Sequence, residues 1–240
     1  MRVLGLDTAT RATAVAVLDT DAQTAQELRD DPAAGDRPRH TTRLLPLAAQ
    51  ALADAGTDWS GIDLIAVGTG PGTFTGIRIG ITTARALACA RAVPIAGVST
   101  LRALALGATG AVSGAERLLA VLDARRREIF VAGWDPGEVA LPDAEPLLAP
   151  RAISPTALAD TLAGSGERWL AVGDGVLACQ EAIERAAVRT LDADCSLHRV
   201  SAIEICRLAL TVQAGSAESV VPDYLREPDA VPARDRVQAR

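Results

Sequence analysis

Residues 68–76 contain four glycines, which is the composition of a loop that could hold an anion. Gly68, Gly70, Gly72 and Gly76 stand between a short apolar run and an Ala/Leu-rich segment of helical character. Glycine permits positive φ and close backbone approach, so N–H groups at the start of that helix could bind a phosphate. A tight strand-to-helix connection is the alternative. Four glycines exceed what such a connection requires, so we predict a binding or close-packing role.

The standard nucleotide motifs are absent from this loop. A Walker loop ends in Gly-Lys-Ser/Thr, and the whole chain contains no lysine. In a dinucleotide-binding loop, Thr73 would stand where a third glycine is required. An anion in this loop would therefore be held mainly by backbone groups.

Two aspartates follow apolar runs at equivalent places in the two halves of the chain. Asp7 precedes Thr8 and a polar bend, and Asp123 precedes the bend that contains Arg125-Arg126-Arg127. Two carboxylates across a cleft could hold a hydrated magnesium ion or position a water molecule. Aspartate is also common in hairpins because its side chain caps nearby N–H groups. The three arginines could contact phosphate or form a solvated hairpin tip.

The remaining reactive side chains predict neither a metal site nor a nucleophile. His40 and His198 are the only histidines, and no carboxylate or cysteine follows His40 at helical spacing. Cys195 lies three residues before His198. Such a spacing of one cysteine and one histidine is more often incidental than the sign of a catalytic pair. We therefore predict no metal and no catalytic residue.

The elements around these residues occur twice in the same order. An apolar strand ending in aspartate begins each half, and a return strand follows. Further on, Gly173 and Gly175 precede a predicted helix over 176–187, as Gly68 and Gly70 precede a helix over 77–92. The repetition predicts an α/β fold of two related lobes that face a cleft. Chance reuse of strands ended by glycine is the alternative.

Other segments complete the predicted organisation. Apolar residues at helical spacing predict a helix over 41–55, in which Pro46 indicates a kink or a late start. We expect a third, more exposed strand over 23–29 and a helix over 100–107 with Ser99 as its N-cap. A last helix over 201–214 is expected to return to the first lobe. We predict a first lobe of residues 1–102 plus 200–226, a second lobe of residues 103–199, and a flexible tail over 227–240.

Composition limits the classes of function. The 240 residues are 49% apolar and carry a net charge of −6, so nucleic acid binding would require a local basic patch or a partner's surface. The four cysteines show no paired spacing, and no segment resembles a signal peptide or a membrane span. These features favour a cytoplasmic protein that contacts no membrane.

Several strings across nearly the whole chain resemble the TsaB family, also called YeaZ, of bacterial tRNA threonylcarbamoyladenosine synthesis. They are Leu6-Asp7-Thr8-Ala9-Thr10, His40 with Arg43-Leu44-Leu45-Pro46, residues 70–80, Asp123-Ala124-Arg125, and Pro222-Asp223-Tyr224-Leu225-Arg226. The glycine loop is the most specific of them. Ala9 and Thr73 stand where the family commonly has serine, and the missing hydroxyl at position 9 weakens a phosphate role there.

The resemblance implies two ribonuclease-H-like lobes, as in the actin, hexokinase and chaperone-ATPase superfamily. It also implies pairing with the metal-bearing catalytic paralogue TsaD, addition of the ATPase TsaE, contact with tRNA through the complex, and a homodimer when the subunit is alone. TsaD-like proteins carry a pair of histidines on a helix, whereas His40 has no second histidine near it in this sequence. The metal and the transfer chemistry of TsaD are therefore not expected here. The implied cleft is a degenerate nucleotide or phosphate site, with ATP or ADP bound, if at all, at an interface of the assembled complex. Its residues are Asp7, Thr8, Gly68, Gly70, Gly72, Asp123, Gly173 and Gly175.

The family's partner surface maps onto two helices, over 41–55 and 76–91. Small residues there permit close helix contact, although burial against the chain's own sheet is the alternative. We expect Ala84→Arg to disrupt assembly without unfolding the subunit. The expected interface residues are His40, Leu44, Leu45, Ala48, Ala51, Arg78, Thr83, Ala84, Leu87 and Ala88.

These features together predict a non-catalytic scaffold that binds and activates a TsaD-type threonylcarbamoyltransferase. A free-standing ATP-dependent small-molecule kinase or ATPase of the same superfamily, using Asp7 and Asp123, is the alternative. A peptidase, suggested by older glycoprotease labels for the family, ranks last because the sequence offers neither a nucleophile nor a set of metal ligands.

Overall fold

The first half of the chain forms a five-stranded sheet. The structure, a computed structural model, describes residues 1–33, 35–186 and 188–226. The strand order is β3-β2-β1-β4-β5, in which β1, β2 and β3 are antiparallel neighbours and β4 and β5 run parallel to β1. The strands are β1 (Arg2–Asp7), β2 (Thr13–Asp19), β3 (Thr24–Asp30), β4 (Leu64–Gly70) and β5 (Ile95–Ser99).

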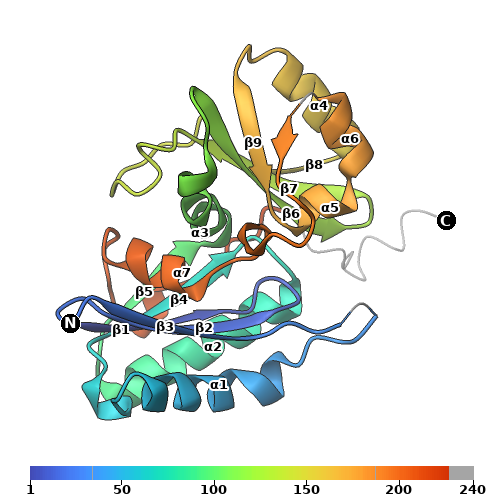
Figure 1. Cartoon of the computed structure of the whole chain (residues 1–240). Helices are drawn as coiled ribbons and strands as arrows, with labels where there is room; N and C mark the ends of the chain where they lie inside the picture. The colour runs from blue at the N-terminus through green and yellow to red at the C-terminus, as the bar shows by residue number, and fades with distance from the viewer. Residues whose placement is uncertain (34, 187, 227–240) are drawn as a thin grey trace, which may run out of the picture.

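The second sheet repeats this plan (Figure 1). Its order is β10-β9-β6-β7-β8, with an antiparallel β6-β7-β8 set and with β9 and β10 parallel to β6. Taken in chain order, the five strands occupy the same relative places in both sheets. This topology confirms the predicted pair of ribonuclease-H-like lobes. The strands are β6 (Glu116–Arg125), β7 (Glu128–Trp134), β8 (Leu148–Ile153), β9 (Arg168–Val172) and β10 (Arg189–Thr190).

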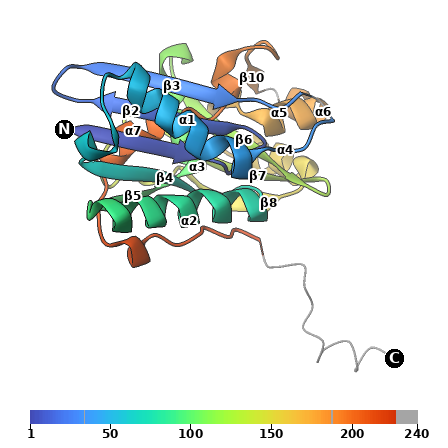
Figure 2. The same ribbon diagram turned by 90° about the horizontal axis from the view of Figure 1, so that it is seen from below.

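The helices form layers around the two sheets. Helices α1 (His40–Asp54) and α2 (Phe74–Arg91) cover the outer face of the first sheet, and Figure 2 shows them side by side over it. Helices α3 (Thr100–Gly107) and α7 (Ala202–Ala209) lie between the sheets (Figure 1). The second lobe carries α4 (Pro155–Ala163), α5 (Asp174–Ala178) and α6 (Gln180–Arg185). Short 3-10 helices occupy 59–61, 109–111, 196–198 and 217–219.

The apolar layer between the sheets belongs to both lobes. Leu101 and Leu104 of α3, Ile205 of α7 and Leu118 of β6 are fully buried in one cluster. The Sγ atom of Cys206 lies 3.6 Å from the backbone oxygen of Val3. The last helix therefore returns to the first sheet, as predicted. Because burial of apolar surface favours the packed state, this shared layer ties the lobes together.

Three predicted helices differ from the observed ones. The helix expected over 176–187 is divided at Cys179, whose φ of −133° ends α5 before α6 begins. The helix expected over 201–214 ends at Ala209, because the chain turns away so that Gly215 can pair with Ile95 of β5. Helix α1 begins at His40 and continues through Pro46, so of the two alternatives, a kink or a late start, the late start is wrong. The tail predicted over 227–240 lies outside the described residues.

Candidate functional site

The glycine loop uses its own N–H groups to pack on the turn after β1. The N–H of Thr73 donates to the carbonyl of Ala9 at 2.7 Å, and the N–H of Gly70 donates to Thr100 Oγ1 at 3.2 Å. The Thr73 hydroxyl accepts from the N–H of Gly76 at 3.2 Å and caps α2. The N–H groups of Gly70, Thr73 and Gly76 are therefore engaged within the chain.

Three of the four glycines are needed for close approach. A Cβ on Gly68 would lie 1.9 Å from Asp7 Oδ2, and one on Gly76 would lie 2.0 Å from the carbonyl of Thr8. A Cβ on Gly72 would lie 2.3 Å from the carbonyl of Ala9. Gly70 alone of the four has a positive φ, of 107°. Of the two predicted roles, the geometry favours close packing.

Asp7 is a buried structural carboxylate in this arrangement. Its side chain accepts from the N–H of Ala9 at 3.1 Å and from Thr100 Oγ1 at 3.2 Å. Only 1% of its surface is exposed, and this burial raises its pKa to about 6. The neighbouring Thr8 hydroxyl donates to the carbonyl of Gly76 at 2.7 Å. Both residues hold the loop to the sheet.

In the second lobe, the buried aspartate beside the glycine pair is Asp174, whereas Asp123 is the residue that the repeat matches to Asp7. Gly173, with a φ of 119°, and Gly175 pack against the backbone of β6. Asp174, which stands between them, accepts from the N–H of Asp123 at 3.0 Å, and burial raises the pKa of Asp174. Asp123 in turn accepts from the N–H of Arg125 at 2.8 Å. The sequence interpretation missed Asp174, although its place between the two matched glycines marks it.

A small cavity of about 10 Å³ lies between the lobes, roughly the space of one water molecule. It is lined by Asp123 and Asp174, but Asp7 is not among its lining residues. This cavity therefore does not bring Asp7 and Asp123 together, and by itself it is too small for a nucleotide. The full lining is Ala9, Thr10, Arg11, Gly72, Thr73, Leu122, Asp123, Arg125 and Asp174.

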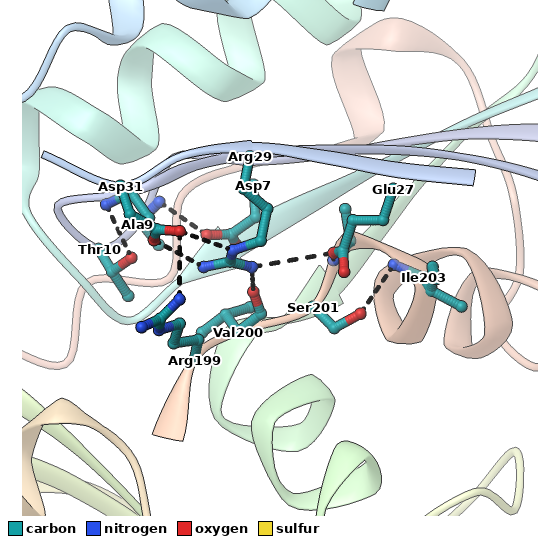
Figure 3. Close-up of polar contacts among 12 residues, drawn as sticks. Asp7, Ala9, Thr10, Glu27, Arg29, Asp31, Arg199, Val200, Ser201 and Ile203 are labelled. Carbon is teal, nitrogen blue, oxygen red and sulfur yellow. Dashed lines mark hydrogen bonds and ion pairs between the residues drawn. The ribbon is translucent and has the colours of Figure 1, made fainter. Parts of the chain in front are cut away.

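A larger depression of about 190 Å³ adjoins this cavity and shares Thr10, Arg11 and Asp174 with it. Figure 3 shows Arg29 reaching both Asp31 and the backbone of Val200. Arg199 lies 3.6 Å from Asp31, so one carboxylate is shared by two guanidinium groups. This arrangement joins the edge of the first sheet to the segment that leads into α7.

Six of the ten expected interface residues are buried in the core of this chain, where they pack α1 and α2 on the first sheet. Because Ala84 is one of them, we now expect Ala84→Arg to disturb folding, whereas the sequence interpretation expected the subunit to stay folded. The partner contacts of the ten residues remain predictions. Apolar spacing identifies a helix face but not what covers it. The remaining four, Leu45, Arg78, Thr83 and Leu87, are at least partly exposed. The six buried residues are His40, Leu44, Ala48, Ala51, Ala84 and Ala88.

Beside Arg78, the outer face of α2 presents an aromatic pair, Phe74 and Tyr224, which the expected interface did not include. Phe74 and Tyr224 stack with ring centroids 5.5 Å apart, and both side chains are exposed. The guanidinium of Arg78 lies 3.6 Å from the centre of the Phe74 ring, and its Nε donates to the Tyr224 hydroxyl at 2.7 Å. A hollow of about 520 Å³ lies beside this cluster, lined by Thr41, Phe74, Thr75, Arg78, Ile79, Thr82 and Thr83.

Both histidines have structural surroundings. The Nδ1 atom of His40 lies 2.9 Å from the Thr13 hydroxyl, and burial lowers the pKa of His40. The Nδ1 atom of His198 accepts from the N–H of Gly173 at 3.1 Å. Across the described ranges, no three His, Cys, Asp or Glu side chains gather as a metal site would require. None of the helices in this part of the chain combines the length and apolar character that a bilayer span needs.

The fold and the site define a two-lobed ribonuclease-H-like protein with small depressions between its lobes and with exposed apolar side chains on α1 and α2. The family described as "TsaD: tRNA N6-adenosine threonylcarbamoyltransferase" matches residues 36–233. The chain belongs to the TsaB family, also called YeaZ. The *Escherichia coli* K12 protein "tRNA threonylcarbamoyladenosine biosynthesis protein TsaB" is 37% identical over 177 residues, which cover 73% of this chain and 72% of that protein.

Further relatives agree over the whole length. The *Bacillus subtilis* protein of the same description is 26% identical over 238 residues and covers 96% of both chains. The solved structure "YeaZ from Pseudomonas aeruginosa" has a TM-score of 0.75 at 31% identity and covers 93% of this chain and 99% of that one. The predicted family membership is confirmed.

Proposed function

We infer that this protein is a subunit of a tRNA threonylcarbamoyladenosine synthesis complex and that it acts as a scaffold for a TsaD-type threonylcarbamoyltransferase. The family membership supports the pathway, since the *E. coli* relative is described by it. The scaffold role rests on the chain's own geometry. The two adjoining depressions between the lobes measure about 10 and 190 Å³, less than a small-molecule site usually has, and the loop that could have held a phosphate is packed on the turn after β1.

The observation that carries the proposal is the exposed face of α1 and α2. Phe74 and Leu45 leave about half of their surface exposed, although large apolar residues usually favour burial. A stacked aromatic pair with an arginine above it is typical of the residues that dominate the energy of protein interfaces. A TsaD-type paralogue with an equivalent helix pair would cover this face. A second copy of this chain would cover it in the homodimer.

Mixing the purified chain with a TsaD-type partner tests the proposal. We expect a 1:1 complex in size-exclusion chromatography with light scattering, and threonylcarbamoylation of a tRNA transcript only when both subunits are present. Phe74→Ala should weaken assembly at least about tenfold, because truncation of a central interface aromatic costs about 2 kcal/mol or more. A chain that forms no complex with any such partner, or that modifies tRNA alone, would contradict the proposal.

The assembled complex is also where the remaining expectations belong. A TsaE-type ATPase and bound ATP or ADP at a subunit interface remain predictions from the family, as does the cytoplasmic location. Isothermal titration of ATP into the chain alone and into the complex separates the two nucleotide alternatives. Binding to the complex only supports an interface site, whereas binding and turnover by the chain alone would favour the kinase alternative.

A further inference from the structure

The hairpin between β6 and β7 carries three consecutive arginines in a backbone conformation that arginine disfavours. Arg125, Arg126 and Arg127 have φ values of 64°, 52° and 64°. Glycine and asparagine are the usual residues there, because a larger residue brings its Cβ close to the backbone. All three arginines are exposed, so core packing does not account for them. Strain kept at an exposed position points to a task for the side chains.

Neighbouring groups hold this hairpin in place. Asp123 Oδ2 lies 2.9 Å from the Arg125 guanidinium, in addition to the backbone hydrogen bond from the N–H of Arg125. Arg226 donates to the carbonyl of Ala124 at 3.3 Å and lies 3.3 Å from Glu128. The tip is therefore fixed from both sides. A hairpin with a fixed backbone loses less entropy when it binds a ligand.

The positive charge continues from the hairpin to the first lobe. Arg125 lines the small cavity, Arg11 lines both depressions, and Arg199 lines the larger one. Together the two depressions are lined by four arginines, Arg11, Arg29, Arg125 and Arg199, and by three aspartates, Asp31, Asp123 and Asp174. The exposed Arg126 and Arg127 add two further charges, in a chain whose net charge is −6. Figure 1 shows the turn after β1 and the β6–β7 hairpin at the same side of the molecule.

We propose that a basic rim, made of Arg11, Arg125, Arg126, Arg127 and Arg199, contacts the phosphate backbone of an RNA. Arg29 is not part of this rim, because its guanidinium is mostly buried against Asp31 and the Val200 carbonyl. The inference rests on the proposed role in a tRNA-modifying complex. Guanidinium groups match phosphate oxygens in charge and in geometry. The arginines lie along an edge that crosses both lobes and do not converge on one deep pocket. That distribution fits an extended polyanion better than a small anion.

The rim is separate from the partner surface. None of the residues that line the two depressions lines the hollow beside Phe74 and Arg78. The proposal requires that a transferase bound on α1 and α2 leaves the rim's residues accessible. RNA held here would lie across this subunit while the chemistry takes place on the partner. This arrangement gives a subunit without a catalytic cleft a direct role in substrate binding.

The test measures binding of a fluorescent unmodified tRNA transcript to the complex with the TsaD-type partner. The variant Arg126→Glu with Arg127→Glu is compared with the control Arg168→Glu with Arg185→Glu. The control makes the same change in net charge, and its residues line neither depression. We expect the hairpin pair to lose at least about tenfold in affinity and the control pair less than about twofold. The slope of log affinity against log salt should fall by about 1 to 2 in the hairpin pair.

A second pair, Arg126→Gly with Arg127→Gly, removes the charges and also suits the positive φ. It should have a melting temperature no lower than that of the wild type, keep the complex, and still lose affinity for tRNA. Equal losses in the hairpin and control pairs, or no loss in the hairpin pair, would overturn the proposal. So would displacement of the tRNA by low millimolar inorganic phosphate, which would indicate a small-anion site.

The same samples separate this inference from the proposed function. Size-exclusion chromatography of the wild-type chain with its partner reports assembly independently of tRNA. If the complex assembles and the hairpin variant binds tRNA as tightly as the wild type, the RNA-binding proposal is wrong and the proposed function stands. If no complex forms, the proposed function fails. The RNA-binding proposal is then tested by comparing tRNA binding to the wild-type chain and to the hairpin-variant chain, each without a partner.

Discussion

The Asp7 carboxylate is hydrogen bonded to the Thr100 hydroxyl at 3.2 Å, which joins the end of β1 to the start of α3. The same hydroxyl accepts from the N–H of Gly70 in the glycine loop. A catalytic aspartate would face substrate, but this one is enclosed by its own fold. Its energetic effect should therefore appear in stability rather than in turnover.

Asp7→Asn should change how stability depends on pH. Burial raises the pKa of Asp7 to about 6 from 3.8, so the folded state holds this proton more tightly than the unfolded state. Protonated Asp7 therefore stabilises the folded state fully below about pH 4. This stabilisation declines by about 3 kcal/mol as the pH rises to about 6 and does not change further above that. Asparagine mimics the protonated form and should remove this decline. Urea unfolding from pH 4 to 8 measures it.

The exposed Asp54→Asn variant is the matched control and should keep the wild-type pH profile. An Asp7→Asn profile with an unchanged slope between pH 4 and 6 would show that Asp7 does not carry the effect.

Gly76→Ala should destabilise the protein by about 2 kcal/mol or more, because its Cβ would lie 2.0 Å from the carbonyl of Thr8. Gly107→Ala is the control at the last residue of α3, where the nearest atom would lie 3.6 Å away. Alanine is favoured over glycine in helices by up to about 1 kcal/mol, so this variant should be neutral or stabilised. Thermal unfolding compares them, and equal melting temperatures would contradict the close-packing role.

Leu45→Arg should abolish partner binding and leave the fold intact, since half of the Leu45 surface is exposed on α1. Ala84→Arg is the opposite case. Ala84 is fully buried, and a charged side chain there should cost about 3 kcal/mol or more of folding stability. Circular dichroism and size-exclusion chromatography with the partner distinguish the two variants. Loss of fold in Leu45→Arg, or a folded Ala84→Arg that fails to assemble, would reverse this assignment.

Arg127→Gly should raise the stability of the chain by about 1 kcal/mol, because arginine at a φ of 64° is strained and glycine is not. Arg168→Gly, at the start of β9, is the comparison. It should lower stability, since glycine weakens a strand. Denaturant midpoints of the two variants give the result. A less stable Arg127→Gly would mean that the arginine side chain supports the hairpin.

Local chemistry made much of the fold predictable. Residues 100–107 form α3 as expected, and the Ser99 hydroxyl caps it by accepting from the N–H of Arg102. The third strand, expected over 23–29, is β3 at Thr24–Asp30. The repeated order of strand, aspartate and glycine pair also correctly indicated two related lobes. Caps, alternation and glycine positions act over a few residues, so the chain itself carries them.

The second lobe was harder to predict. The sequence interpretation included neither β8 nor α4, and it joined α5 and α6 into one helix. Strand β8 pairs only with β7 along an edge, and its side chains are mostly partly or fully exposed, so its apolar pattern is weak. The break at Cys179 coincides with a bond from its Sγ to the carbonyl of Gly175, which sequence spacing does not reveal.

The sequence by itself determined the family, the two-lobe plan and the glycine loop. Only the tertiary structure decided that Asp7 is sealed beneath Gly68, that six expected interface residues belong to the core, and that Phe74 meets Tyr224 across 150 residues of chain. Local preferences depend on neighbours in the chain, and these remain visible in the order of residues. Burial and contact depend on which distant surfaces pack together, and a helix pattern states only that one face will be covered.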